Sequence, residues 1–384
     1  MTTLRVVVDQ IVAPVPGGVG RYTEELTRKL ITTAPADCEV TGIVSDSPDD
    51  DYDRLRMLLP GLAELETLPL KRSQLRRAWQ AGITNVPGTT MSDKGMIHAP
   101  SLLAPLAKHD RLHEVGNQTV VTIHDVVPWT HPDVLNPRKV AWHKAMAKRA
   151  RKFADAIVVP SHAVATELGE IMDFGDRIRV IGGAVSSKLT LPVDADARAR
   201  DLDLPERYIL TAGTLEPRKG IGPLIRSLAE ADAVDLPLLI AGPDGWGDLD
   251  VQALAAEAGL TPGRVRTLGF LPDADLAVAL DRASVFVFPS IAEGFGLPVI
   301  EAFNFGTPVV HSDAPAVVEV AAGAGVTVAR EDAAGYPARL AEAIASVVAD
   351  PALAERLHYQ GLDRASAFSW EDSAQKVWQL HADL

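Results

Sequence analysis

The chain lacks most features that mark secreted, membrane-spanning or disulfide-rich proteins. Its single cysteine, Cys38, cannot form an intramolecular disulfide, which fits a reducing compartment. No apolar run approaches the roughly 18 to 20 residues that a membrane helix needs, and the segment after Met1 lacks a signal-peptide pattern. The sequence therefore predicts a cytoplasmic protein, whose contact with a membrane would be peripheral and at its inner face.

Basic residues are also in short supply. The 384 residues include 37 Lys and Arg against 51 Asp and Glu, which gives a formal net charge of −14. Such a chain as a whole repels nucleic acid and anionic lipid, and we expect no nucleic-acid partner. Hydrophobic residues at 47% and charged residues at 23% are typical of a globular protein, and the length suits two domains.

The chain does contain a regular alternation of short apolar, β-branched runs with helical patterns. Most of these runs are continuously apolar, which is typical of parallel strands covered on both faces. The alternation predicts βαβ units and an α/β fold of doubly wound sheets. The predicted strands are Leu4–Asp9, Glu39–Val44, Gly95–His98, Thr119–His124, Ala156–Pro160, Ile178–Ile181, Tyr208–Ala212, Leu238–Ala241, Val265–Leu268, Val285–Pro289, Pro308–His311 and Val326–Ala329.

Composition along the chain predicts where the domains meet. The stretch Ala184–Pro205 is rich in Asp, Ala and Pro, and we interpret it as the linker. We expect one Rossmann-like domain over residues 1–186, a second over 187–365, and a terminal helix over 366–384 that crosses back to the first domain. Ser369, followed by Asp372, is the predicted cap of that helix.

A glycine-rich segment, Pro16-Gly-Gly-Val-Gly20, follows the first predicted strand and leads into a helix predicted to begin near Arg21. Gly18 allows close backbone approach, and the free N–H groups of a helix start attract phosphate. A tight strand-to-helix turn without a ligand is the alternative. The spacing is not the Gly-x-Gly-x-x-Gly of dinucleotide sites, which disfavours a nicotinamide dehydrogenase.

Arg218 and Lys219 are adjacent in Thr211-Ala-Gly-Thr-Leu-Glu-Pro-Arg-Lys-Gly220, between a strand and a helix. A planar guanidinium and a compact ammonium suit the negative charge of a departing diphosphate. A solvated basic turn is the alternative interpretation.

Two glutamates, Glu293 and Glu301, follow the strand Val285–Pro289 in Glu293-Gly-Phe-Gly-Leu-Pro-Val-Ile-Glu301. The glycines and the proline predict that Glu293 lies in a loop and Glu301 in the first turns of a helix. Carboxylates can each accept hydrogen bonds from two sugar hydroxyls. Two surface glutamates without a role are the alternative.

Four motifs together resemble glycosyltransferase family 4, whose members are retaining enzymes with the GT-B fold. The span Glu293–Glu301 is similar to the family's E-x7-E motif, and Gly213–Gly220 to its diphosphate-binding loop. Pro16–Tyr22 resembles its N-terminal glycine loop, and Thr122-Ile-His-Asp125 its active-site His-Asp. The resemblance covers nearly the whole chain and predicts two Rossmann-like domains that face a central cleft.

The resemblance implies a role for each matching residue. Arg218 and Lys219 would hold the donor's diphosphate, Glu301 the ribose hydroxyls and Glu293 the transferred sugar. The catalytic residues implied in this way are His124, Arg218, Lys219 and Glu293. The implied donor-binding residues are Gly18, Arg218, Lys219, Leu271 with the backbone beside Phe270, Glu293, Gly294, Phe295, Gly296 and Glu301.

Three positions depart from the family pattern. Thr214 stands where some members have Arg, Gly182–Val185 replaces Asn-Gly-Val-Asp, and Val318-Glu319 replaces Pro-Glu. Because Thr214 replaces an Arg, Arg218 and Lys219 would have to supply more of the positive charge at the diphosphate. The other two changes weaken any inference from the family about which donor this chain uses.

Other patterns support secondary hypotheses. His98 could line the same cleft as His124. Asp46–Asp53 contains an Asp-x-Asp pattern, but a solvated acidic loop is the simpler interpretation, and we expect no metal site. Residues 138–153 predict a basic helix. It either packs on the sheet as an ordinary amphipathic helix or makes a peripheral contact with anionic lipid or a lipid-linked acceptor.

The best hypothesis is a retaining glycosyltransferase that needs no cofactor besides its nucleotide-sugar donor. The segment His124-Asp-Val-Val-Pro128 is similar to mannosyltransferase members, so GDP-mannose is the first donor candidate, ahead of other nucleotide sugars. The acceptor would be a glycan, a lipid-linked sugar or a small molecule. An epimerase or hydrolase of the same fold, and a non-catalytic sugar-nucleotide-binding protein, are the alternatives.

Overall fold

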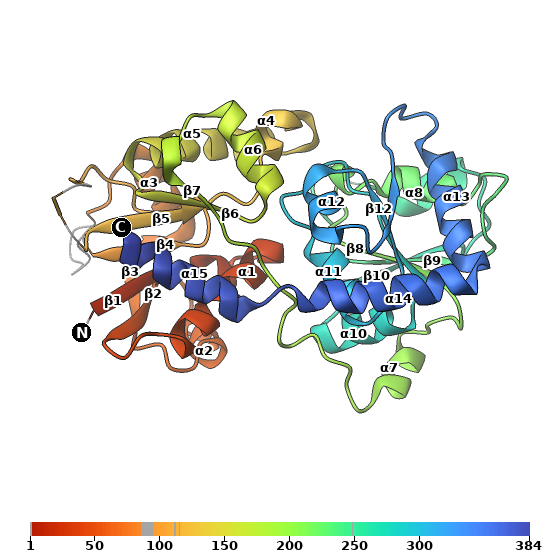
Figure 1. The fold of residues 1–384 in the computed structure, drawn as a ribbon, viewed down its shortest axis with the longest axis horizontal. Coiled ribbons are helices and arrows are strands. Elements are labelled where there is room, and N and C mark those ends of the chain that lie inside the picture. The colour runs from red at the N-terminus through yellow and green to blue at the C-terminus, as the bar shows by residue number, and fades with distance from the viewer. Residues whose placement is uncertain (1, 86–94, 111–112, 115, 248) are drawn as a thin grey trace. The chain divides into compact units, whose positions relative to one another are not determined.

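The computed structural model describes residues 2–85, 95–110, 113–114, 116–247 and 249–384. The chain divides into two compact units. Unit 1 comprises residues 1–132, 137–183 and 369–384, and unit 2 comprises residues 133–136 and 184–368. Each unit is built around its own parallel sheet (Figure 1).

Unit 1 contains a seven-stranded parallel sheet in the order β3-β2-β1-β4-β5-β6-β7. Its strands are β1 Thr2–Val7, β2 Cys38–Asp46, β3 Glu64–Lys71, β4 Met96–Ala99, β5 Gln118–Thr122, β6 Ala156–Val159 and β7 Ile178–Val180. Its α-helices are α1 Gly17–Thr32, α2 Asp49–Leu58, α3 Arg72–Ala81, α4 Val127–Thr130, α5 Pro137–Phe153, α6 His162–Ile171 and α15 Trp370–Asp383. Strands β1 and β4 are neighbours, so the strand order reverses between them.

Unit 2 repeats this plan with a six-stranded parallel sheet in the order β10-β9-β8-β11-β12-β13. Its strands are β8 Ile209–Ala212, β9 Leu238–Ala241, β10 Val265–Gly269, β11 Val285–Phe288, β12 Val309–Ser312 and β13 Val326–Val328. Its α-helices are α7 Ala195–Asp201, α8 Ile221–Ser227, α9 Val251–Glu257, α10 Asp273–Arg282, α11 Leu297–Asn304, α12 Pro315–Ala321, α13 Tyr336–Ala349 and α14 Pro351–Ser366. The order reverses between β8 and β11, which are paired.

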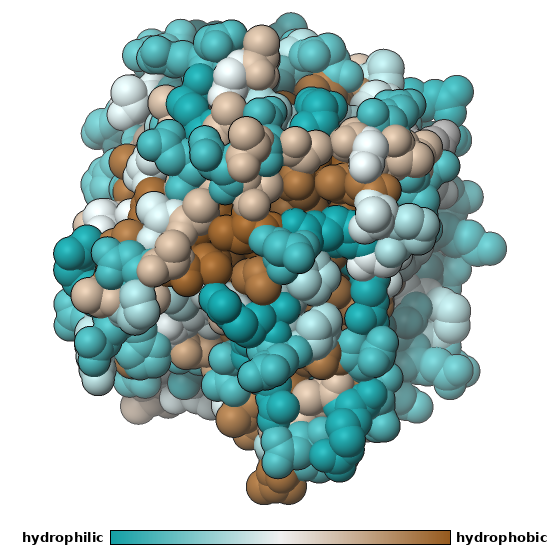
Figure 2. All heavy atoms as spheres, turned by 90° about the vertical axis from the view of Figure 1, so that its right-hand side faces the viewer, coloured by the Kyte–Doolittle hydropathy of each residue, from teal (hydrophilic) through white to brown (hydrophobic). Residues whose placement is uncertain are grey.

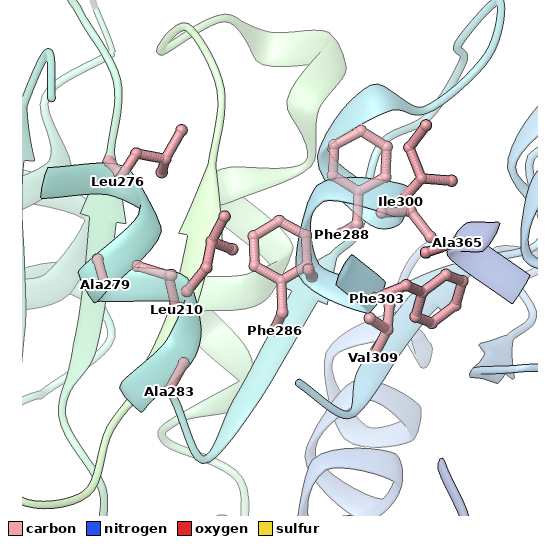
Figure 3. Close-up of a cluster of buried hydrophobic side chains, with 14 of the residues drawn as sticks. Leu210, Leu276, Ala279, Ala283, Phe286, Phe288, Ile300, Phe303, Val309 and Ala365 are labelled. Carbon is pink, nitrogen blue, oxygen red and sulfur yellow. The ribbon is translucent and has the colours of Figure 1, made fainter. Parts of the chain in front are cut away.

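Alternate residues of β11 enter two different cores, one on each face of the sheet. Phe286 and Phe288 pack with Ile300 and Phe303 of α11 (Figure 3), whereas their neighbours Val285 and Val287 pack with α8 and α13 on the other side. A strand buried on both faces must be continuously apolar, which is why the sequence of β11 reads Val-Phe-Val-Phe. The two cores hold the end of β11 and the start of α11 in place. The loop between these elements carries part of the candidate site.

The terminal helix α15 belongs to unit 1, where it packs against α1. Ser369 caps it, because its hydroxyl accepts the N–H groups of Glu371 and Asp372. The indole N–H of Trp378 donates to the carbonyl of Leu30 at 3.2 Å. The hydroxyl of Ser373 donates to the carbonyl of Gly182 at 3.0 Å, so both bonds tie the helix to unit 1.

Two local expectations from the sequence are wrong. The acidic segment Asp46–Asp53 is not a loop, since Asp46 ends β2 and Asp49 begins α2, whose first turn carries three aspartates. Negative charge at a helix N-terminus is stabilised by the helix dipole. Helix α1 begins at Gly17 rather than near Arg21, so Gly18 lies inside its first turn.

The surface of unit 2 is mixed in character. On the face that Figure 2 shows, hydrophilic side chains form most of the periphery and apolar residues gather in a band across the middle. Within the part of the chain that the structure describes, no helix is long and apolar enough to cross a bilayer.

Candidate active site

Two loops of unit 2 meet where its strand order reverses. Residues 213–220 follow β8 and residues 289–296 follow β11, and these two strands are neighbours in a parallel sheet. Both loops therefore leave the same edge of the sheet, at the point where ligands of doubly wound folds bind. This topology brings together the basic pair and the first glutamate of the two sequence motifs.

Glycine is required for the two loops to approach so closely. Gly220 has a φ of +69°, and a Cβ at this position would lie 2.1 Å from the carbonyl oxygen of Pro289. The N–H of Ile291 donates to the carbonyl of Arg218 at 2.8 Å, which ties one loop to the other. Any larger residue at 220 would force the loops apart.

The charged side chains of these loops form a compact ion-pair network. Lys219 Nζ lies 2.6 Å from Glu293 Oε1, and Arg218 Nη1 lies 3.1 Å from Glu293 Oε2. Arg218 Nε also lies 3.0 Å from Glu216 Oε2. Two cations thus face two carboxylates, and the four formal charges cancel.

This environment keeps Glu293 ionised. Burial alone would raise the pKa of Glu293, but the nearby charges of Lys219 and Arg218 outweigh it and lower the pKa to about 2. Burial and the charge of Arg218 lower the pKa of Lys219, whose ammonium also lies 5.3 Å from the ring centroid of Phe288. Arg218 and Lys219 each contact an oxygen of the Glu293 carboxylate and are largely shielded from solvent. Their attraction for an anion is therefore screened less than that of exposed cations.

A further ion pair supports the loop from β12 and β13. The guanidinium of Arg330 donates to the carbonyl of Ile291 and pairs with the carboxylate of Asp313. Arg330 therefore holds the backbone two residues before Glu293 without reaching the ion-pair network itself.

The second glutamate lies where the glycines and the proline predicted. Helix α11 begins at Leu297, directly after Gly296 with a φ of +114°, and Pro298 occupies its first turn. Glu301 is in this helix and is buried, with 5% of its surface exposed. Gly294 and Gly296 are buried as well, whereas Phe295 is partly exposed and packs edge-on against Phe368.

The predicted base contact lies after β10. The side chain of Leu271 packs into the core of unit 2, and that of Phe270 is 71% exposed. A base could therefore meet the backbone at Leu271 or the ring of Phe270. The resemblance to the family implied a contact with the base through the backbone alone.

The remaining site residues belong to unit 1. Gly18 lies in the first turn of α1. Apart from its chain neighbours and the backbone of its own helix, no described atom lies within 4 Å of the position that a Cβ would occupy there. Gly20 has no such space, because a Cβ would lie 2.4 Å from Pro16 Cβ. The backbone of Gly18 is thus open to a ligand, and Gly20 allows the turn to close.

His124 follows β5 and is held in one orientation. Its Nε2 lies 2.7 Å from the carbonyl of Pro100 and must donate to it, so a neutral ring carries its lone pair on Nδ1. Burial lowers the pKa of His124, which favours that neutral form. The ring of Tyr22 packs edge-on against it at 4.8 Å between centroids. His124 can therefore accept a hydrogen bond from a sugar hydroxyl.

Comparison with known proteins agrees with this geometry. The model described as Glycosyltransferase Family 4 matches residues 16–188, and the model of Glycosyl transferases group 1 matches residues 193–364. O-antigen chain mannosyltransferase B of Escherichia coli is 31% identical, over 92% of this chain and 93% of that protein. The chain belongs to glycosyltransferase family 4. It is a glycosyltransferase that uses a nucleotide-sugar donor.

Two further matches support the family and the fold. The serotype-specific mannosyltransferase WbdA of Escherichia coli is 30% identical to this chain. The match covers 67% of this chain and 32% of WbdA. The crystal structure of HepE from Anabaena, in complex with UDP and glucose, superimposes with a TM-score of 0.74 at 18% identity, covering all of both chains. The two Rossmann-like units are thus those of the GT-B fold, as predicted.

Several features of the transferase were missed from its sequence. Glu216 forms an ion pair with Arg218. It lies two residues before Arg218 in the loop 213–220, and this short spacing was the feature of the sequence that could have indicated the pair. The ring of Tyr22 contacts those of His124 and Trp370. These residues are too far apart in the sequence for a motif to predict the contacts.

The secondary hypotheses concerned His98, the basic helix and a metal site. His98 is fully buried beside His381 and lines no surface, which corrects the expectation that it faces a cleft. Of the apolar residues in α5, Met146 is fully buried in the core of unit 1, and Trp142 and Phe153 pack against that core. In the described part of the chain, no group of three or more His, Cys, Asp or Glu side chains is arranged to hold a metal ion.

Proposed function

We propose that this transferase moves mannose from GDP-mannose to a glycan acceptor, with retention of the anomeric configuration. The observation that carries this proposal is the similarity to O-antigen chain mannosyltransferase B along nearly the whole of both chains. The name of that relative specifies the transfer of mannose and an O-antigen chain. A lipid-linked or small-molecule acceptor is the alternative to a glycan.

In the proposed reaction, an acceptor hydroxyl attacks the anomeric carbon from the face that the diphosphate leaves. The new bond joins the acceptor oxygen to that carbon, and the bond to the diphosphate breaks with its electron pair on the phosphate. The acceptor proton passes to a diphosphate oxygen. Arg218 and Lys219 stabilise the charge that develops on the leaving group. No covalent nucleophile is assigned.

Glu293 has two roles in this proposal. Without donor, it balances the charges of Arg218 and Lys219, both of which lie within 3.1 Å of its carboxylate. When the diphosphate takes over these cations, the carboxylate is available to sugar hydroxyls. Glu301 binds the ribose from the first turns of α11, and Gly18 approaches the diphosphate or the acceptor.

The cation pair does the work that a divalent metal does in other transferases, so we propose that the enzyme needs no metal cofactor. We also propose that the exposed basic side chains of α5 support a peripheral contact with anionic lipid. These include Lys139, Lys148 and Lys152.

A thermal-shift screen of the whole chain against GDP-, UDP-, dTDP- and ADP-sugars tests the donor assignment. A ligand at about 100 times its dissociation constant adds about 2.7 kcal/mol of stability, so the correct base should stand apart. Incubation of GDP-mannose with mannose oligomers should then release GDP and lengthen the oligomer. A larger shift with another nucleotide, or GDP release without sugar transfer, would contradict the proposal.

Removal of either cation tests the diphosphate site. Arg218→Ala and Lys219→Ala should each lower turnover by about 10²- to 10³-fold, the usual cost of a lost transition-state stabiliser. Arg226→Ala removes an exposed cation from the neighbouring helix α8 and is the matched control. The assignment is wrong if either variant keeps most of its activity while the circular dichroism spectrum is unchanged.

A further inference from the structure

A cationic and aromatic cluster at the carboxyl edge of the unit 1 sheet has no role in the reaction described above. Helix α3 begins where β3 ends, and α5 leads into the start of β6. The N-terminal halves of both helices, which contain Arg76 in α3 and Trp142 and His143 in α5, therefore lie toward the edge from which His124 projects. We call the side chains of Arg76, Trp142 and His143 the Arg76 cluster.

Within the part of the chain that the structure describes, Arg76 has no direct hydrogen-bond or ion-pair partner. Its neighbour Arg72 is paired, because its guanidinium binds the buried carboxylate of Asp9 and the side-chain oxygen of Gln10. The guanidinium carbon of Arg76 lies 4.4 Å from the ring centroid of Trp142. Among the described residues, no hydrogen-bond acceptor or carboxylate binds Arg76.

The surroundings of Arg76 make this unpaired charge costly. The guanidinium is partly buried, and burial together with the charge of Arg72 lowers the pKa of Arg76, while Asp9 opposes them. An arginine remains protonated even so. A partly desolvated cation without a partner is stabilised most by an anion that arrives from outside.

His143 adds a hydrogen-bond acceptor to the cluster. Its Nδ1 donates to the carbonyl of Lys139 at 2.9 Å, and burial lowers its pKa, so the neutral ring offers a lone pair on Nε2. Its ring lies edge-on to that of Trp142, 5.1 Å away between centroids. The charged groups that influence it are Asp125, Lys139 and Arg76, and Asp125 also faces His124.

Cation, aromatic face and acceptor nitrogen together specify a ligand. A guanidinium fork matches an oxyanion with two parallel hydrogen bonds. The acceptor nitrogens of His143 and His124 match hydroxyl groups, and the ring of Trp142 holds the guanidinium in place. A hydroxylated molecule that bears a phosphate or a carboxylate meets both demands, that of the guanidinium and that of the acceptor nitrogens.

We propose that the Arg76 cluster binds an oxyanion on the acceptor, so that the enzyme selects a negatively charged glycan over a neutral one. The proposal rests on the proposed transfer to a glycan, and it adds the charge class of that glycan. Arg76 is then a specificity-determining residue, on the unit that does not carry the diphosphate-binding pair.

Residue-resolved labelling tests the oxyanion site without any need for activity. The whole chain is treated with the arginine reagent phenylglyoxal in inorganic phosphate, in acetate or in chloride of equal ionic strength, and the labelled peptides are quantified by mass spectrometry. Phosphate or acetate should slow the labelling of Arg76 several-fold. Arg77, the exposed next residue of α3, is the matched control and should label at one rate throughout.

The comparison of phosphate with acetate distinguishes a phosphate ester from a carboxylate as the natural group. The site is refuted if both anions leave Arg76 unprotected, or if they slow Arg76 and Arg77 equally, since equal slowing is only an effect of bulk ions.

Kinetics with a matched pair of acceptors tests the selection itself. The acceptors are mannobiose and mannobiose 6-phosphate, with one donor held at saturation. Arg76→Gln should lower kcat/KM for the phosphorylated acceptor by about 10- to 100-fold, mainly through KM, because a hydrogen-bonded charge pair is lost. The kcat/KM for mannobiose and the KM for the donor should stay unchanged. Arg76→Lys should recover part of the loss, and Arg77→Gln should lose nothing.

The outcomes separate this inference from the proposed function. If neither acceptor is used with any donor but Arg76 is still protected by phosphate, the proposed transfer fails while the oxyanion site stands. If transfer proceeds and the wild type treats both acceptors alike, or Arg76→Gln lowers both equally, the proposed selection is wrong.

Discussion

Glu293 shows what a sequence motif can and cannot specify at the scale of single residues. The motifs predicted that Arg218, Lys219 and Glu293 belong to one site, and the strand order explains why their loops meet. They did not predict that Glu293 lies between the two cations, with Glu216 as a fourth partner. Ion pairs of long side chains depend on rotamers that the surrounding fold selects, and spacing along the chain carries no record of them.

This geometry makes the two glutamates separable by binding measurements. Glu293→Gln should strengthen the binding of free nucleoside diphosphate, because Arg218 and Lys219 lose the carboxylate that competes for them. The same change should lower turnover, since the sugar loses its partner. Glu301→Gln should weaken diphosphate binding, because the ribose loses an acceptor of both hydroxyls. Calorimetric titration with GDP and UDP measures both effects.

A control and a contrary result are both available for this pair. Glu257→Gln, at the end of α9 in the same unit, changes an exposed carboxylate and should leave binding unaltered. Weaker diphosphate binding in Glu293→Gln, with unchanged binding in Glu301→Gln, would mean that the two roles are exchanged.

At the scale of elements, the strands of the described residues were predictable from the sequence with the exception of one edge strand. Each of the twelve predicted strands overlaps an observed one. Most of them are covered on both faces and are therefore continuously apolar. The missed strand, β3 Glu64–Lys71, is at the edge of its sheet and largely exposed, and its sequence contains charged residues and Pro69. Proline is tolerated at an edge, so its presence misled the prediction.

The docking of α15 predicts a loss of stability in acid. His381 Nδ1 lies 2.9 Å from the side-chain oxygen of Gln118, and Nε2 lies 3.4 Å from His98 Nδ1. Burial lowers the pKa of His381 to about 4, and burial with the charge of His381 lowers that of His98 well below its usual value. The unfolded chain takes up protons near pH 6.5, so the free energy of unfolding should fall between about pH 6.5 and 4.

Urea unfolding at a series of pH values measures this dependence. His381→Gln cannot be protonated and should flatten the decline by up to about 1.4 kcal/mol per pH unit, although its stability at pH 7.5 falls. The exposed histidine His113, replaced by glutamine, is the control and should keep the wild-type slope. An unchanged slope in His381→Gln would show that the acid sensitivity arises elsewhere.

The whole molecule divides the predicted chemistry between two units that each have a complete sheet and core. Unit 2 carries Arg218, Lys219, Glu293 and Glu301, and unit 1 carries His124, with Gly18 and the Arg76 cluster. The fold class was predictable because the period of the apolar runs and their alternation with helices repeat along the entire chain. Arg76 escaped notice because it belongs to no motif, and its significance lies in the absence of a partner among the described residues.

This division bears on metal dependence. The aspartates of the Asp46–Asp53 segment belong to unit 1, where Asp49, Asp50 and Asp51 serve the first turn of α2. Arg218 and Lys219 belong to unit 2, and in the proposed reaction they supply two positive charges beside the leaving group. We therefore expect full activity in excess EDTA, measured as GDP release from GDP-mannose with acceptor present. Asp49→Asn should be as active as the wild type. If EDTA abolished activity and manganese or magnesium restored it, the Arg-Lys pair would not be sufficient and a metal site would have to be sought.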